Sequence, residues 1–289
     1  MKNNIPSYRF VPWIVLILLI IIFGLYLKYP TIIITSSETL KSLMKKQLLE
    51  NASPTWQTIG EGVDILTLTA DSENIPAGTN LFFIRFHCDK IQTFVLHDKG
   101  LSTAQRIAED TKALAVINAS FFSPEGKPIG LVMQEGKVTN KLPTRGMLDS
   151  GIFCIKNGWP MIFHRNYFQP SGITEAIQSF PRLVCNGKPV AEVTDNDKRR
   201  RRSGIALDSE GRIIIFITDT NLGGVSFKEI QKILLKPKLN VRAALALDGG
   251  GSSQLYLKYK NYNKVVYGLA EVPVFIGFFP GSVKSYMNK

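Results

Sequence analysis

The sequence predicts an α+β body, a strand-rich domain with a mixed sheet and a few helices, preceded by one N-terminal transmembrane helix. Three observations lead to this prediction. Residues 10–27 form an uncharged apolar run. From about residue 63 onward, apolar residues alternate or form short continuous runs, as strands do. Two segments with helix-start signals lie between such runs, and helices interspersed with strands favour an α+β or mixed-sheet architecture.

The apolar run is long enough to span the ~30 Å hydrocarbon core of a bilayer as a helix. Ile14–Ile22 contains only Ile, Leu and Val, and the aromatic residues Trp13 and Tyr26 stand near the ends of the run, where interfacial aromatics are common. A cleaved signal peptide would need a shorter core and a small-x-small cleavage site, which the segment 24–30 lacks. We therefore expect an uncleaved anchor.

The positive-inside rule sets the expected orientation. Lys2 and Arg9 precede the run, and the lysines that follow it, from Lys28 to Lys46, compete with them. We expect the short N-terminus in the cytoplasm and the body outside it, in a single-pass protein. The expected domains are the anchor (1–30), a stalk with an amphipathic helix over 37–50 (31–60) and the body (61–289).

The amino-acid composition indicates the charge of the binding partner but does not identify the partner. The formal charge of +12 and the pI near 9.6 favour anionic partners such as phosphate esters, anionic lipids or nucleic acid. The three cysteines and three histidines show no zinc-ligand spacing. We expect no cofactor, although an oxygen-bound divalent cation near Asp219 or Asp248 remains open.

The body is expected to contain mainly strands and two capped helices. One helix begins at Ser102-Thr103 and runs into Lys112, and the other begins at Ser226 and ends before Pro237; both starts carry a capping-box pattern. The predicted strands are 63–69, 81–87, 91–97, 113–117, 129–134, 151–155, 161–165, 205–208, 213–218, 243–247, 254–257, 264–267 and 272–278.

The triglycine segment Asp248-Gly249-Gly250-Gly251-Ser252-Ser253 is the most informative motif, and it lies between two predicted strands. Glycine accepts positive φ and has no Cβ, so successive N–H groups could converge on an oxyanion or a sugar oxygen. Asp248 would add a charge, and Ser252 and Ser253 would add donors. A plain hairpin turn is the structural alternative, but such a turn needs only one or two glycines.

Three further segments place polar groups at strand ends. Asn118 could bind a sugar hydroxyl or a phosphoryl oxygen, with Phe121 and Phe122 as an apolar wall; a turn-forming Asn followed by core aromatics is the alternative. Arg202 ends the basic run 198–202 where a strand begins, so its guanidinium could be fixed and bind phosphate with two donors. A solvated charge run is the usual interpretation of such a segment.

Asp219 follows a very apolar strand and is predicted either as a general acid or base or as a turn residue. Together with Asp248 it offers the two carboxylates that glycosidic cleavage commonly uses. The chain has no G-x-x-x-x-G-K-[ST] loop, no G-x-S-x-G elbow and no H-E-x-x-H motif, which disfavours NTPase, α/β-hydrolase and zincin functions.

Taken in order, these segments resemble the phosphodiester glycosidase family. Asn118-Ala119-Ser120-Phe121-Phe122 is similar to its N-G-x-F-F/Y segment, and residues 130–138 are similar to the hairpin that follows. The stretch from Ala176 to Lys188, which includes Arg182, is similar to its A-x-x-x-x-P-x-L-V-x-x-G-K pattern. Arg202-Ser203-Gly204-Ile205-Ala206 resembles R-T-A-I-G. Residues 247–253 match the L-D-G-G-G-S-S hallmark, which is the only one of these motifs that is specific by itself.

The resemblance implies hydrolysis between an anomeric carbon and a phosphodiester. Asp248 would lead as the catalytic carboxylate, with Asp219 second. Arg202 and the 249–253 backbone would bind the leaving phosphate, and Asn118, Phe121, Phe122 and Arg182 would contact substrate. Asp219 is followed by Thr220-Asn221 rather than by the family's Gly-Arg, so the substrate is expected to differ.

Two other functions compete with hydrolysis. The same residues could form a non-catalytic module that binds phosphorylated or acidic glycan. Alternatively, the basic run could bind nucleic acid or lipid, which would give a steep salt dependence and little dependence on Asp248. The triglycine segment favours a phosphorylated glycan as partner, and no nucleic acid is expected.

Overall fold

The computed structural model describes residues 54–281, except for 70–74, 76, 147–148, 191–192, 194–197 and 221–222. These residues belong to one compact unit that begins at Pro54. The expected anchor over 10–27 and the stalk helix over 37–50 lie outside the described residues. Within the part of the chain that is described, no helix combines the length and apolarity needed to cross a membrane.

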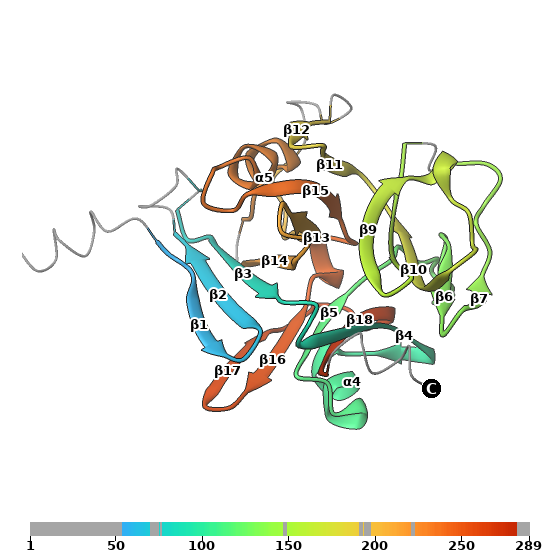
Figure 1. The fold of residues 1–289 in the computed structure, drawn as a ribbon, viewed down its shortest axis with the longest axis horizontal. Coiled ribbons are helices and arrows are strands. Elements are labelled where there is room, and N and C mark those ends of the chain that lie inside the picture. Colours follow the sequence, from blue (N-terminus) through green and yellow to red (C-terminus); the bar gives the residue numbers. More distant parts are fainter. Residues whose placement is uncertain are drawn as a thin grey trace, which may run out of the picture. The chain divides into compact units, whose positions relative to one another are not determined.

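The largest sheet runs in the order β1-β2-β3-β14-β13-β15-β11-β12 (Figure 1). Most of its strands match predicted ones, but β1, β11 and β12 were not expected, and β1 lies ahead of the expected start of the body at residue 61. Its strands are β1 (Gln57–Gly60), β2 (Val63–Leu68), β3 (Asn80–Phe86), β11 (Arg182–Cys185), β12 (Lys188–Pro189), β13 (Ser203–Asp208), β14 (Ile213–Asp219) and β15 (Val241–Ala246).

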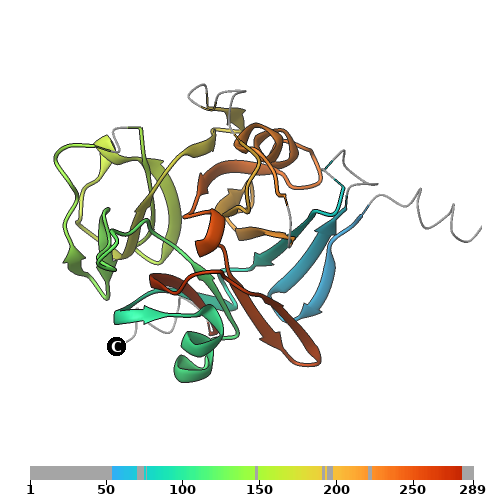
Figure 2. The same cartoon turned by 180° about the vertical axis from the view of Figure 1, so that it is seen from behind.

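Two five-stranded sheets complete the body, and each forms a separate group of strands in Figures 1 and 2. One runs in the order β17-β16-β5-β18-β4 and the other in the order β7-β6-β10-β8-β9. The strands of the first are β4 (Ile91–Ser102), β5 (Ala115–Asn118), β16 (Leu255–Tyr259), β17 (Tyr262–Val266) and β18 (Val272–Pro280). Those of the second are β6 (Val132–Gln134), β7 (Lys137–Asn140), β8 (Gly151–Lys156), β9 (Trp159–His164) and β10 (Ile173–Ser179).

Both predicted helices are confirmed. α4 (Ala104–Thr111) begins at Thr103, whose side chain accepts a hydrogen bond from the Arg106 N–H. α5 (Phe227–Leu234) begins at Ser226 and has both hydrogen bonds of the capping box formed with Glu229. Short 3-10 turns are η1 (Arg165–Tyr167) and η2 (Gly250–Ser252).

The strand-rich α+β prediction is confirmed, but the expected mixed sheet is wrong. All strand pairings of the described residues are antiparallel. Each helix joins two strands that run in the same direction without being neighbours. α4 connects β4 to β5 with β18 between them, and α5 connects β14 to β15 with β13 between them. The inserted strand runs the opposite way, so no parallel pair forms.

A shared hydrophobic core joins the three sheets. It contains residues from each of them, including Leu245 of β15, Ile117 of β5 and Phe153 of β8, all fully buried. A second core cluster lies between the other face of the eight-stranded sheet and α5. Apolar residues on both faces explain why β13 and β14 are buried along nearly their whole length.

Candidate active site

The candidate site lies where the chain passes from one sheet to the next. Residues 119–131 lead from β5 to β6, residues 180–181 lead from β10 to β11, and residues 247–254 lead from β15 to β16. Two backbone hydrogen bonds, each 2.9 Å long, tie these connections together. The Asp248 N–H donates to the Ala119 carbonyl, and the Ala246 N–H donates to the Pro181 carbonyl.

The strand order of the eight-stranded sheet brings the ends of further strands to the edge where these connections lie. Along the run β3-β14-β13-β15-β11, alternate strands start and finish beside one another because every pairing is antiparallel. The end of β14, with Asp219, therefore lies at the edge where β13 begins after Arg201 and Arg202. β15 also finishes at this edge, just before Asp248. Segments far apart in sequence thus meet at one place.

The triglycine segment forms the short 3-10 turn η2, and its glycines have identifiable reasons. Gly250 has φ of +62°, which a residue with a Cβ adopts only with strain. A Cβ at Gly249 would lie 3.0 Å from the Arg201 carbonyl oxygen. The prediction that successive N–H groups converge on a ligand is wrong for most of the turn. The N–H groups of Gly250, Ser252 and Ser253 donate to protein carbonyls instead, since a tight turn uses its own donors.

The Asn118 side chain stabilises this turn through hydrogen bonds to its backbone. Its side chain is fully buried; its Nδ2 donates to the Asp248 carbonyl oxygen at 2.7 Å, and its Oδ1 accepts from the Gln254 N–H at 3.1 Å. The Ser203 hydroxyl donates to the same Asp248 carbonyl at 2.9 Å. Asn118 therefore positions the turn, in contrast to the expected contact with a sugar hydroxyl.

The Asp248 carboxyl is largely shielded from water at the start of the turn. Burial raises the pKa of this carboxyl, and hydrogen bonds from the Ser252 side chain and the Gly249 N–H offset part of that rise. A carboxyl with a raised pKa holds a proton more readily than an ordinary aspartate does. The catalytic role of Asp248 stays a prediction.

The Arg201 guanidinium contacts the backbone of the turn directly. The Arg201 Nη2 donates to the Ser253 carbonyl at 2.8 Å and also to the Tyr267 carbonyl. Its Nε is buried without a partner. Burial lowers the pKa of the guanidinium, and the charge of Asp219 counteracts this. Arg201 is therefore held against the turn with one donor unused.

The Arg202 side chain also lies against the turn, because its Cδ and Nη1 would each lie 3.7 Å from a Cβ at Gly249. Its guanidinium lies 3.6 Å from the Phe227 ring centroid, and it donates to the carbonyls of Val225 and Lys198. These contacts dock the segment onto α5. Arg202 thus lies at the triglycine turn with its guanidinium also held by these protein groups, and its binding of phosphate stays a prediction.

Asp219 lies at the end of β14, as predicted, but in an ion pair. Its Oδ2 lies 2.5 Å from the Lys264 Nζ of β17, with both side chains about one-third exposed. It also interacts electrostatically with Arg201. This arrangement suits Asp219 for stabilising cations at the site rather than for transferring a proton.

Several buried polar atoms at these connections have no hydrogen-bond partner. They are Ser120 Oγ, Ser179 Oγ, Arg182 Nε, Arg201 Nε and Ser253 Oγ, and Thr79 Oγ1 beside the start of β3 completes the set in the described residues. Buried polar groups in proteins are almost always paired, and exceptions mark ligand or catalytic sites. All six belong to segments at the sheet edge described above.

The large aromatic and apolar side chains near the turn differ in their exposure to solvent. Phe122 is partly buried and packs against the core cluster that contains α4. Phe121 stays partly exposed. Phe180, Tyr267 and Leu269 are large apolar residues with 40%, 71% and 81% exposure. The N–H of Leu269 donates to the Gly251 carbonyl at 2.7 Å, which places this exposed segment directly beside the turn.

No cluster of three or more His, Cys, Asp or Glu side chains suitable for a metal ion occurs in the described part of the chain. A cleft of about 900 Å³ has no residue of the turn in its lining. That cleft lies among the turns at the opposite edge of the eight-stranded sheet.

Fold and site together define a strand-rich protein whose polar site is built on the turns between three sheets. The phosphodiester glycosidase family model matches residues 111–279. The match covers more than half of the chain, so the chain belongs to the phosphodiester glycosidase family, a family of glycosidase type. It includes the site segments from Asn118 to Leu269. No curated protein matches the sequence.

Two solved structures share the fold. One is the zebrafish N-acetylglucosamine-1-phosphodiester alpha-N-acetylglucosaminidase catalytic domain, described as auto-inhibited by a pro-peptide. It matches with a TM-score of 0.60 and 16% identity over 78% of this chain and 86% of that one. The other is a hypothetical protein from Synechocystis, with a TM-score of 0.54 and 18% identity over 78% of this chain and 64% of that one.

Sequence reasoning missed several residues of this site. Arg201 belongs to the recognised basic run 198–202 but was not singled out within it. Ser120 stood inside a recognised motif and was passed over. No sequence pattern marks Ser179, Phe180 and Tyr267. They are identified only because the chain segments that connect the three sheets come together in the fold.

Proposed function

We propose that this protein is a hydrolase that cleaves the bond between an anomeric sugar carbon and a phosphodiester in a glycan. The observation that supports this most directly is that one tight turn carries a partly buried carboxyl, Asp248, and is contacted by the partly buried guanidinium of Arg201. A glycosyl phosphate needs a carboxylate near the sugar and positive charge near the phosphate. Family membership supports the same reaction class.

In the proposed reaction, Asp248 acts as the base. Its carboxylate removes a proton from a water molecule as the water oxygen bonds to the anomeric carbon. The bond from that carbon to the phosphate oxygen breaks, and its electron pair leaves with the phosphate monoester. The proton then passes from Asp248 to solvent. Because a phosphate monoester is a stable anion at neutral pH, the leaving group needs no separate general acid.

The remaining residues bind and orient. Arg201 offers its unused Nε–H to the phosphate and stabilises the charge that develops there. The pair of Asp219 with Lys264 keeps a second cation at the edge of the site. Asn118 and Ser203 fix the Asp248 backbone, so they are positioning residues.

Exposed rings at the turn provide a surface for the sugar. Sugar rings have apolar faces that stack on aromatic side chains, while their hydroxyls require buried donors and acceptors. The aromatic surfaces are those of Tyr267, Phe180 and Phe121. The buried donors and acceptors are the unpartnered hydroxyls of Ser120, Ser179 and Ser253. Arg182 provides one further donor. The zebrafish relative is named for an N-acetylglucosamine-1-phosphodiester, which makes that compound a suitable first substrate.

For cellular location, we propose a single membrane anchor at residues 10–27 with the body outside the cytoplasm. The supporting observations are the uncharged run and its flanking aromatics. The substrate would then be a phosphorylated glycan of the cell surface.

Kinetics of Asp248→Asn test the function, with an α-N-acetylglucosamine-1-phosphodiester as substrate. Loss of the base should lower kcat by about 10²–10⁴-fold and leave KM nearly unchanged. Asp110→Asn, an exposed carboxyl on α4, is the matched control and should keep parental kinetics. Near-normal turnover in Asp248→Asn would remove this residue from the chemical step. Binding without any sugar release by the parent protein would instead favour a glycan-binding module.

A further inference from the structure

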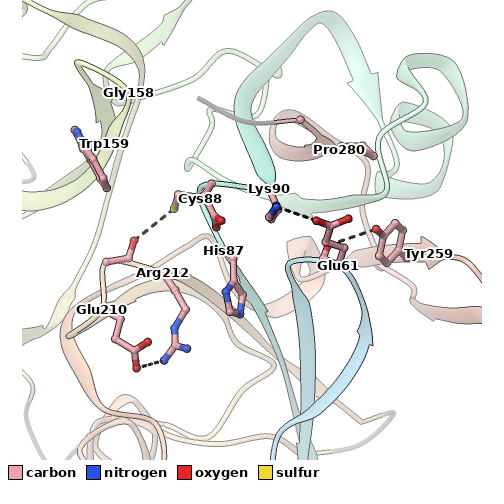
Figure 3. A pocket seen from close by; sticks show the side chains of 13 residues that line it. Glu61, His87, Cys88, Lys90, Gly158, Trp159, Glu210, Arg212, Tyr259 and Pro280 are labelled. Atoms are coloured by element: carbon pink, nitrogen blue, oxygen red, sulfur yellow. Dashed lines mark hydrogen bonds and ion pairs between the residues drawn. The ribbon is translucent and has the colours of Figure 1, made fainter. Parts of the chain in front are cut away.

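A cleft of about 900 Å³ lies at the edge of the eight-stranded sheet opposite to the candidate site. Its lining comes from the turns β1–β2, β3–β4, β8–β9 and β13–β14, together with the ends of β16 and β18. Figure 3 shows Trp159 on one side, Glu61 with Tyr259 on the other, and Cys88 and Lys90 between them. The volume falls in the range of ligand pockets.

Two aromatic residues define the walls of this cleft. Trp159, the first residue of β9, is 66% exposed. The Tyr259 ring is fixed, because it lies directly on the Gly60 backbone, where a Cβ would come within 2.1 Å of the ring. Its hydroxyl also donates to the Glu61 carbonyl at 3.4 Å. An exposed indole and a rigid phenol ring that line one cavity are typical of a ligand-binding surface.

The charges of the cleft are paired with one another. Lys90 Nζ lies 2.9 Å from Glu61 Oε1, and Arg212 contacts Asp208 at 2.7 Å and Glu210 at 2.6 Å. The lining holds acidic and basic residues in similar number, although the whole chain carries +12. A site for a polyanion would show excess positive charge, so this cleft favours a ligand without net charge.

The Cys and His side chains of this cleft are not set up for catalysis. Burial raises the pKa of the Cys88 thiol to about 11, and its Sγ donates to the Gly211 carbonyl at 3.4 Å, so it is not a thiolate nucleophile. His87 Nε2 is held by Asp64 at 3.0 Å. The described residues also contain no metal-binding cluster, here or elsewhere. The cleft is therefore suited to binding.

We propose that this cleft is a second, non-catalytic site that binds an uncharged oligosaccharide. The sugar faces stack on Trp159 and Tyr259, and the hydroxyls bond to the ion pairs of Glu210 with Arg212 and of Glu61 with Lys90. Such pairs present both donors and acceptors, which suits hydroxyl groups. The site would hold a glycan chain at a distance from the turn that carries Asp248, and it does not depend on hydrolysis there.

Ligand-observed NMR titration of the full chain tests this proposal with three uncharged tetrasaccharides: cellotetraose, maltotetraose and chitotetraose. At least one should bind, and Trp159→Ala should weaken that binding by about tenfold or more. Trp159→Phe should keep most of the affinity because it keeps a ring. Tyr167→Ala, which removes another exposed aromatic residue (76%) outside the cleft lining, is the matched control and should bind as the parent does.

Two further measurements separate this site from the candidate active site. Asp248→Asn should bind the tetrasaccharide unchanged, because Asp248 lies at the other edge of the sheet. Tetragalacturonate, an acidic tetrasaccharide, should show no binding that depends on Trp159. The proposal is overturned if none of the three uncharged tetrasaccharides binds, or if Trp159→Ala binds like the parent.

Discussion

Glu175 of β10 makes the stability of this protein depend on pH in a predictable way. The side chain is only 2% exposed. Its Oε2 accepts from the Val95 N–H at 2.9 Å and its Oε1 from the Glu135 N–H at 3.0 Å. It thereby joins β4 to the turn between β6 and β7. Burial raises its pKa from 4.5 to about 7, and the two N–H groups only partly offset that rise.

The direction of the effect follows from the raised pKa. The folded state holds this proton more tightly than the unfolded chain, so the contribution of Glu175 to stability is fully present below about pH 4.5 and is lost as pH rises through about 7. A rise from 4.5 to about 7 corresponds to at most about 3 kcal/mol. Glu175→Gln cannot ionise and should lack this loss, although its amide leaves one of the two N–H groups unsatisfied.

Urea unfolding of the parent and of Glu175→Gln between pH 5 and 8.5 measures the difference. The parent should be the more stable protein at pH 5, and its advantage should shrink by about 2–3 kcal/mol toward pH 8.5. Glu109→Gln changes an exposed side chain on α4, and its free energy of unfolding should depend on pH in the same way as that of the parent. Equal pH slopes for the parent and Glu175→Gln would refute the reasoning.

Three further changes probe the candidate site. Arg201→Gln should lower kcat on the sugar phosphodiester by about 10²-fold, whereas Arg199→Gln, which loses only an exposed ion pair with α5, should not; equal effects would contradict the assigned role. Asn118→Ala leaves buried backbone groups unpaired and should cost about 2–4 kcal/mol in urea unfolding, and a change within about 0.5 kcal/mol would show that the turn does not need it. Gly250→Ala, at φ of +62°, should cost about 1 kcal/mol and lower kcat, and unchanged stability would argue against strain there.

Local sequence patterns predicted most elements of the fold but not how they pair. Alternating runs identified β2, β3, β13 and β14, because these strands have apolar faces or interiors that the sequence displays directly. β10 and β11 were missed. β10 mixes Thr, Glu and Gln with apolar residues, and its polar side chains are buried through specific bonds such as those of Glu175. Pairing depends on which strand enters between two others, and no local pattern contains that information.

The candidate site shows a similar division. Asp248 and its glycines were identified because three glycines beside a carboxylate are unusual in composition. Their roles changed on folding, since the turn uses its N–H groups internally and Asn118 bonds to the backbone. The basic run predicted Arg202 at the site, but only the fold shows that Arg201 also contacts the turn.

The pairing of β5 with β18 has a consequence for when the candidate site can assemble. Asn118 bonds to Gln254 and Asp248, and β5 gains its second neighbour only from Val272–Pro280, near the end of the described chain. During synthesis, a ribosome must therefore release almost the entire body before these partners coexist. Nascent fragments that stop short of β18 would therefore lack the assembled site.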